Sequence, residues 1–309
     1  MPEMDTVVAI LVATIRAGTP LVFAALGELV TEKSGVLNLG IEGMMLIGAV
    51  TGFIATVVTG DPWIGVVAAI LAGAAISVLF GFLTINLMAN QVATGLALTI
   101  FGVGLSAFAG LSYIGTPIES LAPLAVPGLS AIPVIGPLVF NHDPLVYLSL
   151  AMVAGVAWFL YRSRGGLILR AVGESHDAAH AIGFSVVKVR YLAVMFGGAM
   201  SGLAGAYLAL VYTPQWAENM TAGRGWIALA LVVFATWRPA RVLLGAYLFG
   251  GITIIGLHVQ AAGFGISPHL LATLPYLATV VVLVLISRDP TRIRLNAPAA
   301  LGTPFHAGR

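Results

Sequence analysis

Long, continuously apolar runs fill most of this sequence and leave few charged residues between them. The chain of 309 residues is 59% hydrophobic and only 8% charged, whereas ordinary soluble domains carry about 25% charged residues. A soluble fold with so few charges could not cover its own surface. The runs are also longer than the segments of alternating polarity that build outer-membrane barrels. The sequence therefore predicts an all-α, polytopic membrane protein.

The apolar runs set the number of membrane spans. A transmembrane helix needs about 20 mainly apolar residues, so the chain has room for about nine spans, with about eight or ten as alternatives. The first run contains Arg16, Gly18 and Pro20, which predicts a half-helix followed by a helix. The seventh run is too short to cross the bilayer unaided. The expected spans are residues 6–30, 43–59, 63–88, 92–115, 144–161, 191–213, 225–237, 242–259 and 268–287.

Basic residues gather in three connections of this arrangement. They lie in residues 163–190, at Arg238 and Arg241, and after the last span. With nine spans these groups fall on one side of the membrane, which the positive-inside rule assigns to the cytoplasm. The N-terminus is then outside and the C-terminus is cytoplasmic. The prediction treats residues 1–294 as a single transmembrane domain and residues 295–309 as a disordered tail.

Two polar, glycine-rich stretches occupy matching places in the two halves of the chain. Residues 34–43 and residues 218–226 each precede an apolar run that is closed by an X-Pro turn, Asp61-Pro62 or Arg238-Pro239. The predicted topology puts the two stretches on opposite sides of the membrane. Transporters built from inverted repeats show this pattern and bind their substrates near it. We therefore expect an inverted repeat.

The first of these stretches also carries polar side chains close to a span. Irregular backbone at membrane depth survives only where protein or a water-filled cavity satisfies its polar groups. One interpretation is a capped helix start, because a helix N-terminus favours an anion such as Glu42; the other is a broken element that lines a transport path. Amide side chains also lie at the start of the fourth span. Hydrogen bonding between helices is the favoured interpretation for them, and contact with a transported solute is the alternative. The candidate path residues are Asn38, Gly40, Glu42, Gly43, Asn90 and Thr94.

The run GELVTEKSGVLNLGIEGMMLIGA (27–49) resembles the start of ABC importer permeases in the branched-chain amino acid, simple-sugar and nucleoside superfamily. The resemblance is nearest to the nucleoside and simple-sugar permeases that work with basic-membrane-protein-type lipoproteins. It implies a permease subunit of an importer, in a bacterial inner membrane, for a nucleoside or a simple sugar. The resemblance continues through residues 90–102, 169–210, 221–250 and 274–285.

The basic loop of residues 163–190 contains a predicted short helix. Ser175 is placed to cap its start and Gly183 to end it, and a helix this short gains order only by docking. From the residues alone a solvated loop is the favoured interpretation. In the resembled family the corresponding segment is a coupling helix that sits in a cleft of the ATPase. Carried over by position, with Asp177 added as an acid in the first turn, the coupling residues are Gly173, Glu174, Asp177, Ala178, Ala179 and Gly183.

The chain lacks the means to hydrolyse ATP. The P-loop pattern is absent, and the only lysines, Lys33 and Lys188, lie in other contexts. We therefore expect no enzyme activity and no cofactor in this chain, with ATP and magnesium bound by a partner. The resemblance implies that this partner is a double-domain ATPase, and it adds a second homologous permease and a periplasmic substrate-binding lipoprotein.

Other classes of function have weaker support. No nucleophile–base pair or metal-binding constellation can be found, and a net charge of +2 gives no sign of nucleic acid. The spans themselves imply contact with membrane lipid. An ion-coupled secondary transporter, or a channel for a small polar solute, remains the alternative. Proton coupling asks for carboxylates within the spans, and Glu28 and Glu42 are its candidates.

Overall fold

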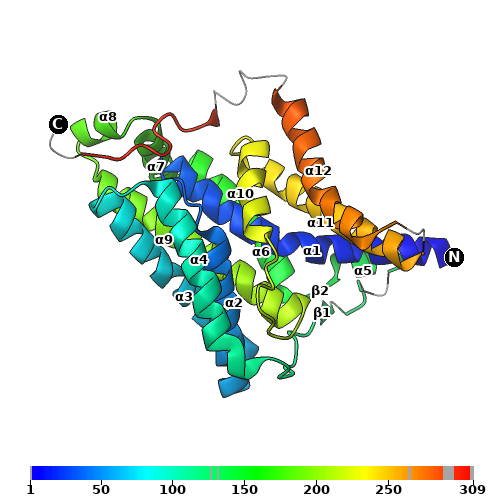
Figure 1. Cartoon of the computed structure of the whole chain (residues 1–309). Coiled ribbons are helices and arrows are strands. Elements are labelled where there is room, and N and C mark those ends of the chain that lie inside the picture. The colour runs from blue at the N-terminus through cyan, green and yellow to red at the C-terminus, as the bar shows by residue number, and fades with distance from the viewer. Residues whose placement is uncertain (1, 126, 131, 264–265, 288–295, 307–309) are drawn as a thin grey trace.

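The computed structural model describes residues 2–125, 127–130, 132–263, 266–287 and 296–306, and its regular structure is almost entirely helical (Figure 1). A short antiparallel pair of strands, β1 (Leu124–Ala125) and β2 (Asn141–His142), lies in the long connection before α6. The predicted all-α fold is confirmed. The helices are α1 (Pro2–Lys33), α2 (Ile41–Thr59), α3 (Pro62–Gly81), α4 (Gln91–Gly110), α5 (Ile135–Val139), α6 (Pro144–Arg162), α7 (Arg164–Glu174), α8 (His176–Ala181), α9 (Val186–Tyr207), α10 (Arg224–Phe234), α11 (Pro239–Ala261) and α12 (Pro268–Ser287).

Seven helices of the described chain are long and apolar enough to cross a membrane. They are α1, α2, α3, α4, α6, α9 and α11, of which α3 and α9 each continue through one π-helical turn. Two shorter apolar segments, Arg224–Phe234 and Thr273–Val282, accompany them. A polytopic membrane protein is therefore confirmed, and the total of nine spans stays a prediction.

Helix α1 corrects one detail of the sequence analysis. It is a single helix that runs through Pro20, so the expected break into a half-helix and a helix is wrong. A proline inside a helix removes one hydrogen bond and costs about 3 kcal/mol. From Ala17 to Glu32 the helix is buried against α6, α9, α10 and α11, and this packing holds it together. The guanidinium of Arg16 donates a hydrogen bond of 3.2 Å to the carbonyl of Val211.

Helix α9 lies at the centre of the molecule and packs against α1, α2 and α3. Its contacts depend on glycines that let the backbones approach closely. A Cβ atom added at Gly202 would overlap the carbonyl oxygen of Ala69 in α3, and one added at Gly48 in α2 would overlap Gly202 itself. The small residues of α9 therefore fix the positions of both neighbouring helices.

Both predicted X-Pro turns begin helices. Pro62 starts α3, and Asp61 caps that start by accepting a hydrogen bond of 2.8 Å from the Trp63 amide. Pro239 starts α11 directly after Arg238. The helices therefore begin and end close to the glycine-rich stretches and the X-Pro turns, as the sequence predicted. The inverted repeat itself stays a prediction.

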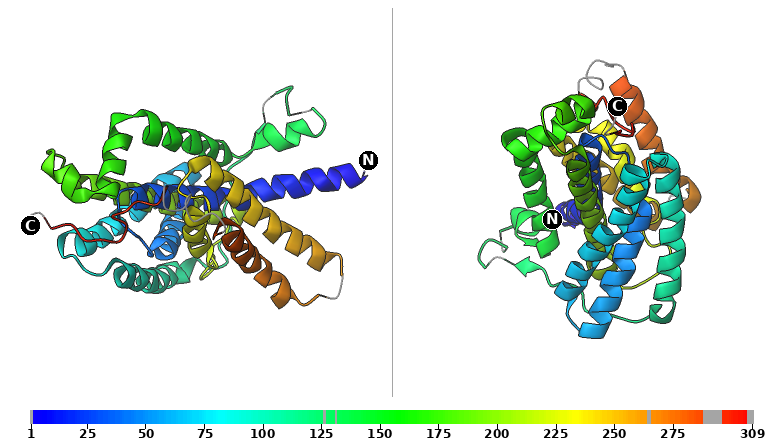
Figure 2. Two further views of the ribbon diagram at one scale, coloured as in Figure 1. Left: turned by 90° about the horizontal axis from the view of Figure 1, so that it is seen from above. Right: turned by 90° about the vertical axis from the view of Figure 1, so that its left-hand side faces the viewer.

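Residues 296–306 differ from the disordered tail that the sequence predicted. Ala300 and Phe305 are each 6% exposed. The Ala300 amide donates a hydrogen bond of 2.9 Å to the carbonyl of Gly173. Figure 2 shows this red segment beside the green helices α7 and α8. Within residues 296–306 the backbone bonds to two loops of the helical domain and the apolar side chains pack there. Residues 295 and 307–309 of the predicted tail lie outside the described residues.

Candidate coupling surface and solute path

Helices α7 and α8 form a hairpin between α6 and α9, at one end of the molecule (Figure 1). Ser163 caps α7, and its hydroxyl accepts a hydrogen bond of 2.9 Å from the Gly166 amide. Ser175 caps α8 as the sequence predicted, with the Ala178 amide 3.3 Å from its hydroxyl. The chain leaves α8 through Gly183 with φ +93°, a conformation that favours glycine. The ends of the predicted short helix are confirmed, whereas α7 before it was not expected.

The hairpin exposes a mixed face, on which Leu167 and Ile182 accompany the polar residues, and buries an apolar one. Ala179 is 2% exposed and packs with Val172, Val186 and Phe305. The remaining members of the predicted coupling set, apart from Gly173, face outward. These outward-facing residues are Glu174, Asp177, Ala178 and Gly183. The hairpin therefore offers two carboxylates and a small residue to the surroundings while its back is fixed to the protein.

Gly173 joins the hairpin to the end of α1. A Cβ atom at this position would overlap the carbonyl oxygen of Lys33, the last residue of α1. Only glycine allows the two backbones to approach this closely. The end of α7 thus lies directly on the loop of residues 34–40, which leads into α2 and the predicted solute path.

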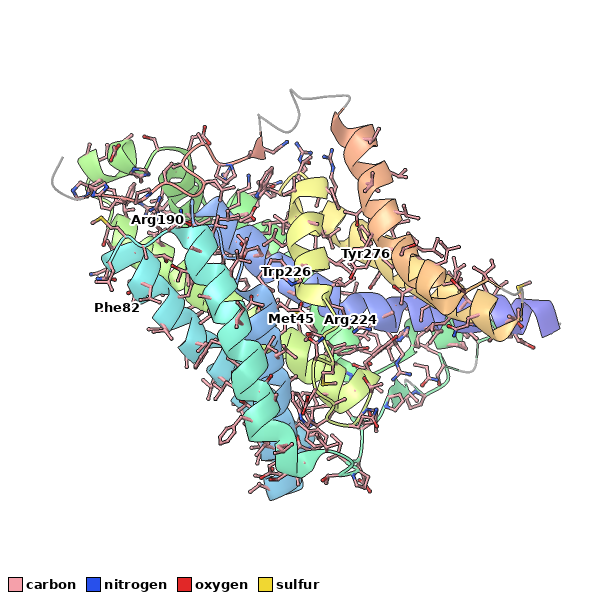
Figure 3. All side chains as sticks on the ribbon, in the orientation of Figure 1. Met45, Phe82, Arg190, Arg224, Trp226 and Tyr276 are labelled. Carbon is pink, nitrogen blue, oxygen red and sulfur yellow. The ribbon has the colours of Figure 1, made fainter. Side chains whose placement is uncertain are left out.

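Arg190, near the start of α9, ties this end of the molecule together (Figure 3). It is 1% exposed, and its three nitrogens donate to the carbonyl of Ser34 at 3.4 Å, the carbonyl of Thr303 at 3.1 Å and Nδ1 of His176 at 3.4 Å. Burial and the nearby guanidinium lower the pKa of His176 from its usual value. A neutral imidazole fits this geometry, because Nδ1 can then accept the hydrogen bond from arginine.

Glu42 lies at a junction between α2 and α10. Its Oε1 accepts hydrogen bonds from the hydroxyl of Thr221 and the amide of Gly223, and its Oε2 accepts one from the amide of Gly225. The carboxylate is 4% exposed. Free amides at a helix N-terminus bind anions well, so Glu42 satisfies the start of α10. The side chain thus caps a second helix far along the chain, which neither sequence interpretation included.

Helix α10 is a half-length element. Its 11 residues span about 16 Å, whereas the hydrocarbon core is about 30 Å thick. Its start meets Glu42, next to Gly43, which packs on Leu98 within α4. Its end leads to Trp237, whose indole N–H donates to Glu32 near the end of α1. Helix α10 therefore extends only from the joint at Glu42 to the end of α1, which agrees with the prediction that this segment is too short to cross the bilayer unaided.

The structure brings four of the six predicted path residues together. Asn38 is fully buried, and its side-chain oxygen accepts a hydrogen bond of 2.9 Å from the Gly40 amide. Gly40 and Gly43 both lie against Leu98 of α4, and a Cβ atom at Gly43 would overlap the α4 backbone. With Glu42 they form a compact turn at the entrance to α2. The turn is a packed joint between α2, α4 and α10.

Asn90 and Thr94 lie apart from this joint. Asn90 is exposed and caps α4 by accepting a hydrogen bond of 2.9 Å from the Ala93 amide. Both side chains line an open apolar groove of about 420 Å³ between α3 and α4, beside Leu83 and Phe101. Among the amides of this region, Gln91 instead joins two elements, since its Oε1 accepts a hydrogen bond of 2.8 Å from the Leu37 amide.

A mainly apolar pocket with a few polar groups, called the α10 pocket below, opens beside the start of α10. Its volume is about 270 Å³, and it lies between α10, α11 and α12. Arg224 and Tyr276 both face it (Figure 3), and the Arg224 guanidinium is held by the carbonyls of Met220 and Thr221. Thr253 and Gln260 add polar groups, while the remaining lining is mainly apolar. The pocket can therefore contact both the polar and the flat apolar parts of a small solute.

Two carboxylates near the end of α1, Glu28 and Glu32, are also buried. Oε1 of Glu28 accepts a hydrogen bond of 2.9 Å from the Asn38 amide, whereas its Oε2 has no partner among the described residues. Glu32 accepts from the indole of Trp237. The two acids lie one turn apart on α1, each bound to a different loop. Their hydrogen bonds hold the connections around residues 34–40 and 235–238 against α1.

The family model described as the branched-chain amino acid transport system / permease component matches residues 10–287. The chain belongs to this family. The putative glucose ABC transporter permease protein TsgC13 of Haloferax volcanii is 41% identical, over 96% of this chain and 97% of its own length. The guanosine ABC transporter permease protein NupQ of Bacillus subtilis is 32% identical, over 96% of each. The nucleoside ABC transporter permease protein NupC of Lactococcus lactis is 31% identical, over 92% of this chain and 94% of its own length.

These relatives confirm the family to which the sequence was assigned. The permease is a transport component of an ABC transporter, a system that includes other subunits. The roles of its individual residues rest on the geometry above. Residues that this geometry adds to those predicted from the sequence include Arg190, Thr221 and Phe305. Arg190 carried a signal, since it is a cation near the start of a long apolar run without a nearby acid in the sequence.

Proposed function

We propose that this permease is the membrane subunit of an ATP-driven importer that moves a nucleoside or a simple sugar inward across a bacterial inner membrane. The relatives named for guanosine, nucleoside and glucose transport support both classes of solute. The end with α7 and α8 then faces the cytoplasm, together with residues 296–306. A second, homologous permease completes the path, and a periplasmic lipoprotein delivers the solute.

The observation that carries the proposal is the α7–α8 hairpin. Its back is held by the buried side chain of Ala179 and by the close contact of Gly173 with α1. Its front exposes Glu174 and Asp177. A projection that is fixed at its back and exposes two carboxylates suits a cleft in a double-domain ATPase, and its motion would reach the helices through α1 and α9.

Transport then requires no covalent chemistry in this chain. ATP and magnesium bind to the partner ATPase, and closure of its nucleotide-binding domains pushes on the hairpin. The force reaches the loop of residues 34–40 and the joint at Glu42, where α10 begins. Alternating access follows when α10 and its neighbours change their position relative to α2 and α4.

The α10 pocket is our candidate for contact with the solute. Half-length helices that end partway through a membrane commonly mark substrate sites in transporters. Arg224 brings a positive charge to the lining, and its guanidinium is held by the carbonyls of Met220 and Thr221. A pocket with hydrogen-bonding groups and an aromatic ring, Tyr276, suits a polar solute with a flat face. The pocket is small and open, so we expect weak binding, with affinity supplied by the lipoprotein.

The alternative, an ion-coupled transporter, has less support from the same residues. All three hydrogen bonds of Glu42 come from groups of the α10 start. A carboxylate that holds the fold in this way is poorly placed to load and release a proton in each cycle. Glu28, the other candidate, accepts a hydrogen bond from the Asn38 amide through Oε1, whereas its Oε2 has no partner among the described residues, so proton coupling would depend on Glu28.

Native purification of the chain in mild detergent, with mass spectrometry of co-eluting proteins, tests the proposal. We expect a double-domain ATPase and a second permease. Recovery of the folded chain alone, in several detergents, would contradict an ABC assembly. Uptake driven by an ion gradient without ATP would then become the next experiment.

A further inference from the structure

We propose that residues 296–306, called the C-terminal strap below, position the α7–α8 hairpin and connect it to the loop that enters α2. This inference rests on the proposed function, because it assigns the strap a part in energy coupling. Phe305 is the main positioning residue.

The strap forms hydrogen bonds with the end of α7 and with the loop that enters α2. The amide of Ala300 donates a hydrogen bond of 2.9 Å to the carbonyl of Gly173 at the end of α7. The amide of Gly302 donates one of 3.1 Å to the carbonyl of Gly35 before α2. The Lys33 ammonium bonds to the carbonyl of Asn296. The strap therefore bridges the hairpin and the path loop through backbone groups.

Phe305 fixes the far side of the hairpin. Its ring is 6% exposed and joins Val172 and Ala179 in one apolar cluster. The imidazoles of His176 and His180 meet the ring edge-to-face, with centroids 5.5 Å and 5.2 Å away. Aromatic pairs in this geometry are favourable beyond simple burial. The six-residue helix α8 is too short to be stable alone, so the ring supplies much of its packing.

Arg190 links the strap, the path loop and α8 through one side chain. One guanidinium binds the strap at the carbonyl of Thr303, the path loop at the carbonyl of Ser34 and α8 at His176. From this loop the contacts continue through Asn38 to the joint at Glu42, four residues further along. A displacement of α8 cannot occur without moving the strap or breaking these bonds. The strap thus makes the hairpin and the path loop one rigid unit.

A single engineered thiol tests the docking, because the chain contains no cysteine. In Ala179→Cys the thiol replaces a residue that is 2% exposed. We expect slow reaction with a maleimide, and reaction about tenfold faster or more after Phe305→Ala, since local opening raises the reactive population. Ala178→Cys, at an exposed position on the same helix, should react fast in both backgrounds. Phe305→Leu should restore protection.

The functional arm measures solute moved per ATP hydrolysed by the assembled transporter, with unmodified Ala179. Phe305→Ala, and a chain that ends at residue 295, should both lower this ratio while the subunits still assemble. Phe305→Leu should recover most of it. Thiol reactivity unchanged by Phe305→Ala would overturn the proposal, as would an unchanged ratio despite an exposed thiol. If the wild type shows no ATP-dependent uptake, the proposed function fails, and the thiol reaction alone then decides whether the strap positions the hairpin.

Discussion

Oε2 of Glu42 in α2 accepts a hydrogen bond of 2.6 Å from the backbone amide of Gly225 at the start of α10, 183 residues further along the chain. Its other oxygen binds Thr221 and Gly223 on the same approach to α10. One carboxylate therefore fixes where the half-length helix begins. Both glycine-rich stretches of the sequence meet at this point.

Glu42→Gln should destabilise the protein by about 3 kcal/mol, because an amide nitrogen would face a backbone N–H in a buried site. Thermal unfolding in detergent measures the effect. Thr221→Val removes only one of the three donors and should cost about 1 kcal/mol. Equal losses for the two variants would show that the carboxylate does not organise the start of α10.

Gly202→Val should strongly reduce the amount of folded protein. The new side chain would overlap the carbonyl of Ala69, and inserting atoms into a packed core costs about 1–3 kcal/mol or more. Gly155→Ala in α6 is the matched control, because nothing lies within 4 Å of its added Cβ atom. Size-exclusion chromatography of detergent extracts compares them. A normal yield of folded Gly202→Val would contradict the close contact of α9 with α3.

His176 makes the docking of α8 depend on pH. Burial and Arg190 lower its pKa in the folded state, His306 adds to this, and Asp177 opposes it. The unfolded state then binds the proton more readily, so stability is full above the usual pKa of 6.5 and falls as the pH drops below it. Thermal unfolding at about pH 7.5 and about pH 5.5 measures this loss.

His176→Asn is the control for the pH experiment. Its side-chain oxygen can still accept the hydrogen bond from Arg190 but does not titrate. We expect the variant to lose less stability than the wild type between the two pH values. An identical loss in both proteins would assign the pH dependence to other groups.

Gln260→Ala should lower the rate of solute uptake by about fivefold, the effect of one lost hydrogen bond of about 1 kcal/mol. Gln260 is exposed in the pocket beside Arg224, so folding should be unaffected. Uptake by membrane vesicles, normalised to protein amount, measures the change. Asn90→Ala, in the groove between α3 and α4, is the comparison; a larger effect there would move the solute path to α4.

The sequence allowed the prediction of features that depend on neighbouring residues. Ser175 caps α8 and Gly183 ends it because both signals act within one helical turn. The membrane class followed from composition. The short seventh segment, residues 225–237, was recognised from its length as too short to cross a bilayer unaided.

The features that could not be predicted depend on partners far along the chain. Glu42 could be placed at a helix start, but its binding to α10 requires the fold. The tail lacks hydrophobic periodicity, so its backbone bonds to Gly35 and Gly173 leave no local signal. Pro20 predicted a break, yet tertiary packing of α1 outweighs that local preference.

The most direct test of the account is ATP-dependent solute uptake by the assembled transporter with Glu174→Ala and Asp177→Ala combined. Both side chains are exposed on the hairpin, so protein level and folding should stay normal. Glu119→Ala, an exposed acid in the loop after α4 that lies beside Pro62 and Trp63, serves as control. We predict that uptake falls about tenfold or more in the double variant, equivalent to about 1.4 kcal/mol of lost coupling, and is unchanged in the control. Normal ATP-dependent uptake by the double variant would contradict the assignment of α7 and α8 as the coupling element.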